Sequence, residues 1–260
     1  MTVHTPLPLT GERTVPEVPA ENYWFRRHEV AYRWIADEFA NQISDCVVVD
    51  AGCGEGYGVG LLAQFGPEVA VGLELDAASS KHAALRYGAA AAVVRANLDS
   101  IPLRDGSVDL LVSMQVIEHL WDLDGFLREC RRVLAYSGIG VFSTPNRLTF
   151  SPGLARGQKP TNPFHVEEFD ADQLDSLVRR AGFTDVQLLG LRHGDRLLDW
   201  ESANGSVIDA QVRAALSESP WPAELTAIVE SVDCDDFVVR AADIATSQDL
   251  IVVARAGAQQ

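Results

Sequence analysis

The 260-residue sequence predicts a doubly wound α/β fold around a mostly parallel seven-stranded sheet. Three observations predict it. Strand-like and helix-like patterns alternate along most of the chain, which is typical of parallel strands joined by right-handed crossovers. A glycine-rich turn follows the first strand pattern directly. Two late strand patterns, at 184–193 and 249–256, are separated by a long segment and fit an antiparallel pair that completes the sheet.

The elements follow from the local pattern in chain order. Residues 1–20 predict a Pro-containing extended arm, and apolar residues at helical spacing predict a helix over 22–40. The β-branched run that begins at Cys46 predicts the first strand. The later helix patterns fall at 59–65, 77–88, 123–134 and 171–182, and the later strand patterns at 69–76, 92–98, 108–115, 138–146, 184–193 and 249–256. Residues 196–247 predict an irregular, acidic, helical insertion before the last strand.

The composition excludes several classes of protein. The net charge of −16 disfavours nucleic acids and anionic membranes as partners, because both attract Lys and Arg. No stretch approaches the roughly 20 apolar residues of a membrane-spanning helix. The four cysteines form no C-x-x-C pair, which argues against a structural zinc site and a disulfide framework. The N-terminus lacks a basic-then-apolar leader, so we expect a cytoplasmic protein.

The glycine-rich turn indicates which ligand the fold binds. Gly52, Gly54 and Gly56 follow a buried strand and let a ligand approach the backbone, although a tight strand-to-helix turn alone would also need glycine. Their G-x-G-x-G spacing differs from the G-x-G-x-x-G of dinucleotide-binding proteins. Asp50 and Glu55 bracket the turn, where they would repel a pyrophosphate and attract an ammonium and a sulfonium. The loop therefore favours S-adenosylmethionine over NAD.

An acidic residue ends the second strand pattern. Glu74 lies 18 residues after Gly56, in GLELD, where a carboxylate can accept hydrogen bonds from both ribose hydroxyls. A solvated acid at a strand end is the alternative for Glu74 alone. Together with the glycine turn, the ribose role is favoured.

The motifs resemble class I S-adenosylmethionine-dependent methyltransferases, in order and spacing, over about 45–195. Four segments carry the resemblance: VVVDAGCGEGYG, GLELD, ANLDSIPLRDGSVDLLVSMQVIEHLWD and LRECRRVLAYSGIGVFSTPN. The resemblance implies a Rossmann-like methyltransferase fold. It also implies cofactor-binding roles for Leu75, for Asp50 at the amino end, Gly52, Gly54 and Gly56 along the methionine part, Glu74 at the ribose, Asn97 and Leu98 at the adenine edge, and Gln115 beneath the methionine end. Many relatives have Asp where this chain has Asn97.

A narrower resemblance concerns the methyl acceptor. The segments GERTVPEVPAENYWFRRHEVAYRWIA, QVIEHL, STPNRLTFSPG and NPFHVEEF resemble actinobacterial sugar O-methyltransferases that act in the synthesis of polymethylated polysaccharides. This implies a sugar or oligosaccharide substrate. We expect one methyltransferase domain over 1–260, with an arm and lid helix at 1–40 and an insertion at 196–247 that covers the acceptor site.

Two histidines are candidate bases. Methyl transfer to a hydroxyl needs in-line alignment and removal of a proton, for which histidine is well suited. His119 follows the fourth predicted strand and His165 follows the fifth, so both should reach the carboxyl edge of the sheet. Local hydrogen bonding of Glu118 and His119 is the alternative.

The same residues also resemble the E-x-x-E-H…H metal pattern of some magnesium-dependent methyltransferases. Gln115 replaces the first Glu, which leaves Glu118, His119 and His165 as candidate ligands. A magnesium ion on Glu118 would lower the pKa of a coordinated sugar hydroxyl.

Aromatic and basic residues of the N-terminal helix have two interpretations. Tyr23, Trp24, Phe25 and Trp34 at helical spacing are typical of a core, and Arg26, Arg27 and His28 of a solvated face. Alternatively, the helix is a lid whose Arg or His reaches the cofactor carboxylate. Trp121, Trp200 and Trp221 are candidates for stacking on sugars or for packing.

Other functions remain open at this point. A dehydrogenase should have glycine at position 57, where this chain has Tyr57. A non-catalytic S-adenosylmethionine-binding regulator would keep the loop but not the histidines. Within the methyltransferases, the alternative acceptor is a small phenolic, quinone or lipid precursor. The acidic composition disfavours a membrane-embedded substrate.

Overall fold

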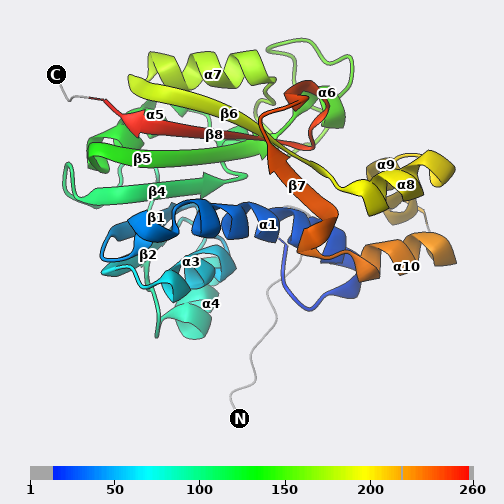
Figure 1. The fold of residues 1–260 in the computed structure, drawn as a ribbon, viewed down its shortest axis with the longest axis horizontal. Helices are drawn as coiled ribbons and strands as arrows, with labels where there is room; N and C mark the ends of the chain where they lie inside the picture. The colour runs from blue at the N-terminus through cyan, green and yellow to red at the C-terminus, as the bar shows by residue number, and fades with distance from the viewer. Residues whose placement is uncertain (1–13, 218, 258–260) are drawn as a thin grey trace.

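The computed structural model describes residues 14–217 and 219–257 (Figure 1). The first thirteen residues of the predicted N-terminal arm lie outside this description. The strands are β1 Val47–Ala51, β2 Val69–Glu74, β3 Ala92–Arg95, β4 Val108–Met114, β5 Leu134–Pro145, β6 Phe183–His193, β7 Phe237–Arg240 and β8 Asp249–Ala256. The α-helices are α1 Asn22–Glu38, α2 Ala40–Ile43, α3 Tyr57–Leu62, α4 Ala77–Tyr87, α5 Leu123–Val133, α6 Arg147–Phe150, α7 Ala171–Arg180, α8 Asp195–Asn204, α9 Val207–Ala215 and α10 Ala223–Ser231.

The strands form one sheet in the order β3-β2-β1-β4-β5-β8-β6-β7. Strands β1 to β5 pair in parallel, and β8 pairs antiparallel with both β5 and β6. The predicted late antiparallel pair is therefore present, with the last strand inserted between two earlier ones. This arrangement confirms the doubly wound, mostly parallel sheet.

The predicted strand number is wrong, because the sheet has eight strands and not seven. The additional strand is β7, which lies within the segment 196–247 that was predicted to be helical. Its four residues pair antiparallel with the end of β6, from His193↔Phe237 to Gly190↔Arg240. A short edge strand within an otherwise helical, acidic segment gives too few alternating positions for the pattern to show.

Side-chain alternation along the strands builds two cores, one on each face of the sheet. Val48, Leu110 and Val141 point to the face that packs against α1 and α10. Their neighbours Val49 and Leu111 point to the face that packs against α5 and α7. Since successive side chains of a strand point to opposite faces, the uninterrupted apolar runs in the sequence are those of strands buried on both sides.

The carboxyl ends of β1, β2, β4 and β5 meet at one edge of the sheet, toward the right in Figure 1. Helices α8, α9 and α10 lie together beyond this edge, and α1 extends toward it (Figure 1). Ligands of open α/β sheets bind at such an edge. In the described part of the chain, no helix has both the length and the apolar character that crossing a membrane requires.

Candidate active site

The glycine loop after β1 has the backbone that the sequence predicts. Gly52, Gly54 and Gly56 have φ angles of +89°, +55° and +95°, which side chains rarely adopt. A Cβ on Gly52 would lie 2.5 Å from Val116 Cγ2, and one on Gly56 would lie 2.7 Å from Ala83 Cβ. Gly54 has no atom within 4 Å of its Cβ position. The loop is therefore packed on two sides and open at Gly54, where a ligand can approach.

Glu74 lies beside this opening, at the end of β2. Its carboxylate accepts hydrogen bonds from the backbone N–H of Gly54 (2.9 Å) and from that of Asp76 (2.7 Å). These donors fix the carboxylate next to the loop. The following Leu75 is 59% exposed, so its side chain is available to a bound ligand.

Asn97 and Leu98 follow β3, the next strand of the sheet. The Asn97 amide forms two hydrogen bonds with Asp99, one from the Asp99 N–H to the Asn97 Oδ1 and one from the Asn97 Nδ2 to the Asp99 carboxylate. The carbonyl oxygen has a second lone pair, so it can still accept a hydrogen bond from a ligand. Leu98 is buried, and Asn97 is exposed at the rim.

Asp50 is fully buried at the end of β1. Both carboxylate oxygens accept from the Tyr32 hydroxyl of α1, at 3.1 and 3.2 Å. Burial, with a smaller contribution from the nearby Glu74, raises the pKa of Asp50 to about 7, although the hydrogen bond from Tyr32 lowers it. Glu55 is also buried, 3.3 Å from the His82 Nε2, and burial raises its pKa to about 7. A cationic ligand at the loop would therefore favour the ionised form of both acids.

Replacing Asp50 with Asn is expected to stabilise the ligand-free protein, and by more at about pH 8 than at about pH 5. The pKa of Asp50 is about 7 in the folded state and near 3.8 in the unfolded chain. Between these values the folded state holds a proton that the unfolded state has lost, so the stability of the wild type falls as the pH rises. Asn keeps an oxygen for the Tyr32 hydroxyl and has no such dependence.

Urea unfolding of wild type and D50N at both pH values measures the effect. The difference in free energy of unfolding should grow by on the order of 1–3 kcal/mol over this range. Asp124→Asn, at an exposed position of α5, is the control. A D50N difference that does not change with pH would contradict the buried, neutral Asp50.

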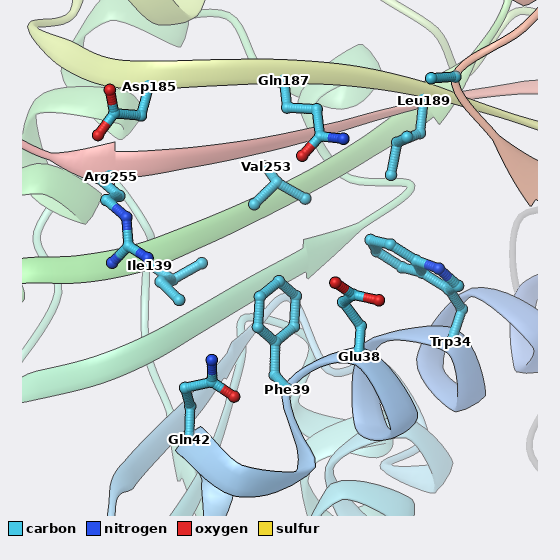
Figure 2. Close-up of a pocket in the computed structure, with 11 residues that line it drawn as sticks. Trp34, Glu38, Phe39, Gln42, Ile139, Asp185, Gln187, Leu189, Val253 and Arg255 are labelled. Carbon is cyan, nitrogen blue, oxygen red and sulfur yellow. The ribbon is translucent and has the colours of Figure 1, made fainter.

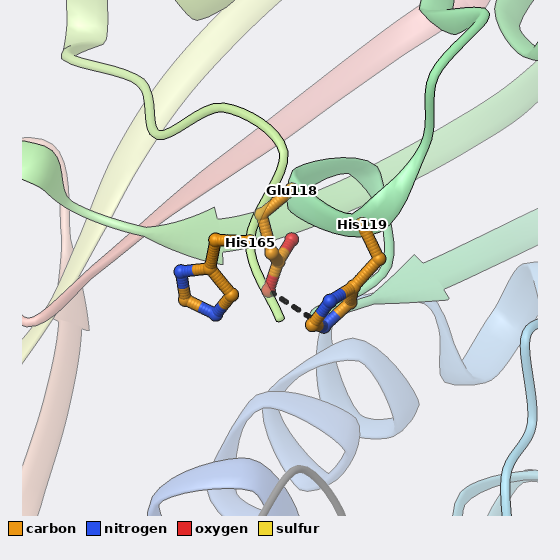
Figure 3. A group of neighbouring side chains, drawn as sticks. All are labelled: Glu118, His119 and His165. Atoms are coloured by element: carbon orange, nitrogen blue, oxygen red, sulfur yellow. Dashed lines mark ion pairs between the residues drawn. The ribbon is translucent and has the colours of Figure 1, made fainter. Parts of the chain in front are cut away.

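The second part of the site is a cluster of Glu118, His119 and His165 (Figure 3). Gln115 follows β4 with a φ of +56°, and its side-chain amide donates to the Ser143 Oγ at 3.1 Å. The short 3-10 helix Ile117–His119 comes next. The segment that carries His165 is joined to this helix by the hydrogen bond from the Val166 N–H to the Glu118 carbonyl, at 2.7 Å.

The three side chains of the cluster are close enough to act together. Each residue offers one ligand atom, and these three atoms all lie within 4.8 Å of one another. The centroids of the two imidazole rings are 5.1 Å apart, and the rings meet edge to face. Glu118 is 1% exposed, its Oε2 has no hydrogen-bond partner, and its Oε1 lies 3.9 Å from the His119 Nε2. Burial raises the pKa of Glu118 to about 7.

The protein fixes the orientation of both rings. The His119 Nδ1 lies 3.1 Å from the Phe164 carbonyl oxygen, which can only accept, so Nδ1 carries the hydrogen and Nε2 can take a proton. The His165 Nδ1 lies 2.8 Å from Glu168, and its Nε2 lies 3.0 Å from the Asn162 Nδ2. Asn162 and Glu168 both belong to the NPFHVEEF segment, but the sequence pattern indicated no role for either.

Arg27 of helix α1 differs from both sequence interpretations. Arg27 is buried in an ion pair with Asp249 at the start of β8, and its guanidinium lies 4.7 Å from the centre of the Phe150 ring. Arg27 is therefore neither on a solvated face nor available for a cofactor carboxylate. Arg26 pairs with Glu29 on the same helix, at 2.6 Å.

The start of α1 is held to two other segments. The buried Tyr23 hydroxyl lies 2.7 Å from the His193 Nε2, and the His193 Nδ1 lies 3.0 Å from Glu201 of α8. The Asn22 amide donates to the carbonyls of Val229 and Val232, at 3.1 and 2.8 Å. Helix α1 is thus a wall that connects the sheet to the insertion. Helical periodicity correctly indicated that Tyr23 is core, but not its partners.

Comparison with known proteins identifies the family. The sequence model of the methyltransferase domain matches residues 49–142. A probable S-adenosylmethionine-dependent methyltransferase of Mycobacterium tuberculosis is 48% identical over 95% of this chain and 89% of its own length. A probable S-adenosylmethionine-dependent methyltransferase of Mycolicibacterium smegmatis is 46% identical over 95% of both. The chain belongs to the S-adenosylmethionine-dependent methyltransferases, and S-adenosylmethionine is its methyl donor.

More distant relatives agree with this assignment. A malonyl-[acyl-carrier protein] O-methyltransferase of Laribacter hongkongensis is 32% identical over 61% of this chain and 59% of its own length. The crystal structure of an S-adenosylmethionine-dependent methyltransferase from Mesorhizobium loti covers 86% of this chain, and this chain covers 97% of it, with a TM-score of 0.56 and 19% identity. At that identity the likeness shows the fold alone, which is the Rossmann-like methyltransferase fold.

Proposed function

We propose that the protein methylates a hydroxyl group of a sugar or oligosaccharide, with His119 as the base. The observation that carries this proposal is the oriented cluster of Glu118, His119 and His165 beside the glycine loop. Val116, which packs against Gly52, lies two residues before Glu118, so the cluster adjoins the methionine end of the cofactor-binding loop. This placement supports His119 and His165 as acceptor-side groups, and the residues named for the loop as cofactor-binding.

The chemistry needs alignment and one proton transfer. S-adenosylmethionine supplies an activated methyl group when it is bound. An acceptor hydroxyl would give its proton to the His119 Nε2, while the Phe164 carbonyl holds the Nδ1 hydrogen. The imidazolium that forms is stabilised by the Glu118 carboxylate, 3.9 Å away. Glu168 and Asn162 hold His165 opposite His119.

A metal-assisted reaction is the second candidate. Glu118, with one unpartnered oxygen, and two histidines oriented by Phe164 and Glu168 form the kind of set that holds a cation. Magnesium, the ion that the sequence pattern suggests, prefers six oxygen ligands, whereas two of these three ligands are imidazoles. We therefore favour proton transfer to His119 alone. Turnover that is lost with chelator and restored by magnesium would favour the metal.

Exposed aromatic residues support a sugar as the acceptor. Trp121, two residues after His119, is 90% exposed, and Phe164, next to His165, is 54% exposed. The other four tryptophans pack against the core on the α1 face. Large exposed aromatic groups beside a polar cluster suit the apolar faces and polar edges of a pyranose ring. Helices α1 and α8–α10 are proposed to cover this acceptor.

Replacing Trp121 with Ala is expected to raise the KM for a sugar acceptor by roughly 2- to 10-fold, the loss of one aromatic contact of about 0.5–1.5 kcal/mol. The affinity for S-adenosylhomocysteine should not change, and Trp121→Phe should recover part of the loss. Tyr136→Ala removes a similarly exposed aromatic residue (79%) from β5, and is the control. An unchanged KM for W121A would remove Trp121 from the acceptor site.

The proposed function is tested by titration calorimetry with S-adenosylhomocysteine, followed by methyl-transfer assays on partly methylated glucose and mannose oligosaccharides, with and without magnesium. Binding and turnover on a sugar are expected. Binding without sugar turnover would contradict the sugar acceptor and favour small phenols, quinones or lipid precursors. Relatives named O-methyltransferases support a hydroxyl or carboxyl oxygen as the acceptor atom.

A further inference from the structure

A groove of about 670 Å³ lies on the sheet face that α1 covers, between the end of α1 and strands β5, β6 and β8 (Figure 2). None of the residues that line it belongs to the active site described above. Ile139 of the groove pairs with Arg255 at one end of β5, whereas Pro145 pairs with Asp249 at the carboxyl edge. Six residues of strand place Ile139 about 20 Å from the carboxyl edge, and the groove extends from Ile139 toward that edge as far as Leu189.

The groove has an apolar floor and a polar rim. Ile139, Leu189 and Val253 form the floor, and the Trp34 ring of α1 lies along one wall (Figure 2). The rim side chains come from both sides of the groove, Glu38 and Gln42 from the helices and Asp185, Gln187 and Arg255 from the strands (Figure 2).

Most of these rim side chains form no polar contact with the described part of the protein. Within the part of the chain that the structure describes, the side chains of Glu38, Gln42, Asp185 and Gln187 make no hydrogen bond or ion pair with the protein, whereas Arg255 donates to the Ser137 carbonyl at 3.0 Å. Carboxylates accept, amides donate and accept, and a guanidinium donates. The rim can therefore bind a ligand that has both donors and acceptors.

A distortion of β6 brings Asp185 to the rim. The pairing of β6 with β8 shifts between Thr184 and Gln187, so β6 has one residue more than β8 there. Asp185 has a φ of +49°, an uncommon value for a residue other than glycine. Bulges of this kind redirect side chains and recur near binding sites.

We propose that this groove binds a stretch of sugar residues of an oligosaccharide acceptor, at a distance from the methyl-transfer site. A pyranose ring has apolar faces and a rim of hydroxyl groups, which matches the apolar floor, the Trp34 ring and the mixed rim. Two carboxylates and one guanidinium disfavour a polyanion. The identity of the ligand rests on the proposed function, and the groove itself does not.

The test uses the full-length protein with S-adenosylhomocysteine bound and long and short maltooligosaccharides as probes in titration calorimetry. Gln187→Ala, Glu38→Ala and Asp185→Gly each remove one rim group, and glycine at 185 retains the positive φ. Each variant should weaken binding of the long probe by roughly 3- to 10-fold, as expected for the loss of one hydrogen bond. Glu68→Ala, an exposed acid before β2, should have no effect. Thermal melting verifies that each variant is folded.

A second measurement separates the groove from the transfer site. In methyl-transfer assays, the three rim variants should raise the KM for long acceptors and leave the KM for short acceptors and kcat unchanged. Equal binding of the long probe by wild type and rim variants would overturn the groove and leave the proposed function intact. Turnover on short sugars without any binding of the long probe would also overturn the binding role of the groove and leave the proposed function intact. A dimer in light scattering that the rim variants dissociate would assign the groove to contacts between copies and also overturn the proposal.

Discussion

Replacement of His119 with Ala is expected to lower kcat/KM for the acceptor by roughly 10²- to 10⁴-fold, the usual contribution of a general base. The His119 Nε2 can take the hydroxyl proton because the Phe164 carbonyl holds the hydrogen on Nδ1. The His165 Nδ1 is likewise held by an acceptor, Glu168, but its Nε2 lies 3.0 Å from the Asn162 Nδ2, which can donate to it. Glu118 is buried. Steady-state kinetics with the acceptor identified by the assays above measure the loss.

The affinity of the same variant for S-adenosylhomocysteine separates catalysis from folding. Phe164, Glu118 and His165 surround His119, and none of them belongs to the glycine loop, so calorimetry should give a dissociation constant within about 2-fold of wild type. If the H119A variant binds S-adenosylhomocysteine and methylates the acceptor as the wild type does, His119 is excluded as the base. Loss of both properties would indicate a structural role in place of a catalytic one.

Gly54→Ala is expected to weaken S-adenosylhomocysteine binding by roughly 10- to 100-fold, as overpacking of a close contact costs about 1–3 kcal/mol. The Cβ added at position 54 would meet no protein atom within 4 Å, so it would occupy the open side of the loop next to Glu74. The positive φ of 55° at this position adds about 1–2 kcal/mol of backbone strain.

Gly106→Ala is the matched control for this strain. Gly106 has a φ of +64° and also has no atom within 4 Å of its Cβ position, but it lies in the turn before β4, at the opposite edge of the sheet. Both variants should lose similar stability in urea unfolding, and only G54A should lose cofactor affinity. Equal affinities for G54A and wild type would show that the cofactor does not approach Gly54.

Local patterns predicted those parts of the fold and site that depend on neighbouring residues. The glycine turn and Glu74 are close in space because they end adjacent parallel strands, which the sequence reveals as β-branched runs. His119 and His165 meet for the same reason, since each follows a strand that ends at the carboxyl edge.

Contacts between distant segments could not be predicted in this way. Arg27 and Asp249 are 222 residues apart, and nothing in the spacing of either residue indicates the other. Tyr23, His193 and Glu201 come from three elements whose relative positions are set by packing. The register shift that turns Asp185 toward the groove depends on how β6 pairs with β8, which hydrophobic periodicity does not specify.

The central position of β8 determines when the protein can complete its fold during synthesis. Strands β1 to β5 can pair as they emerge from the ribosome, but β6 can join the sheet only through β8, which is made after all the others. The charge of Arg27, near the start of the chain, is paired only after Asp249 of β8 has been synthesised, because Asp249 is its ion-pair partner. Assembly of the wall between sheet and insertion is thus a late, long-range step, which favours slow folding that depends on the C-terminal strand.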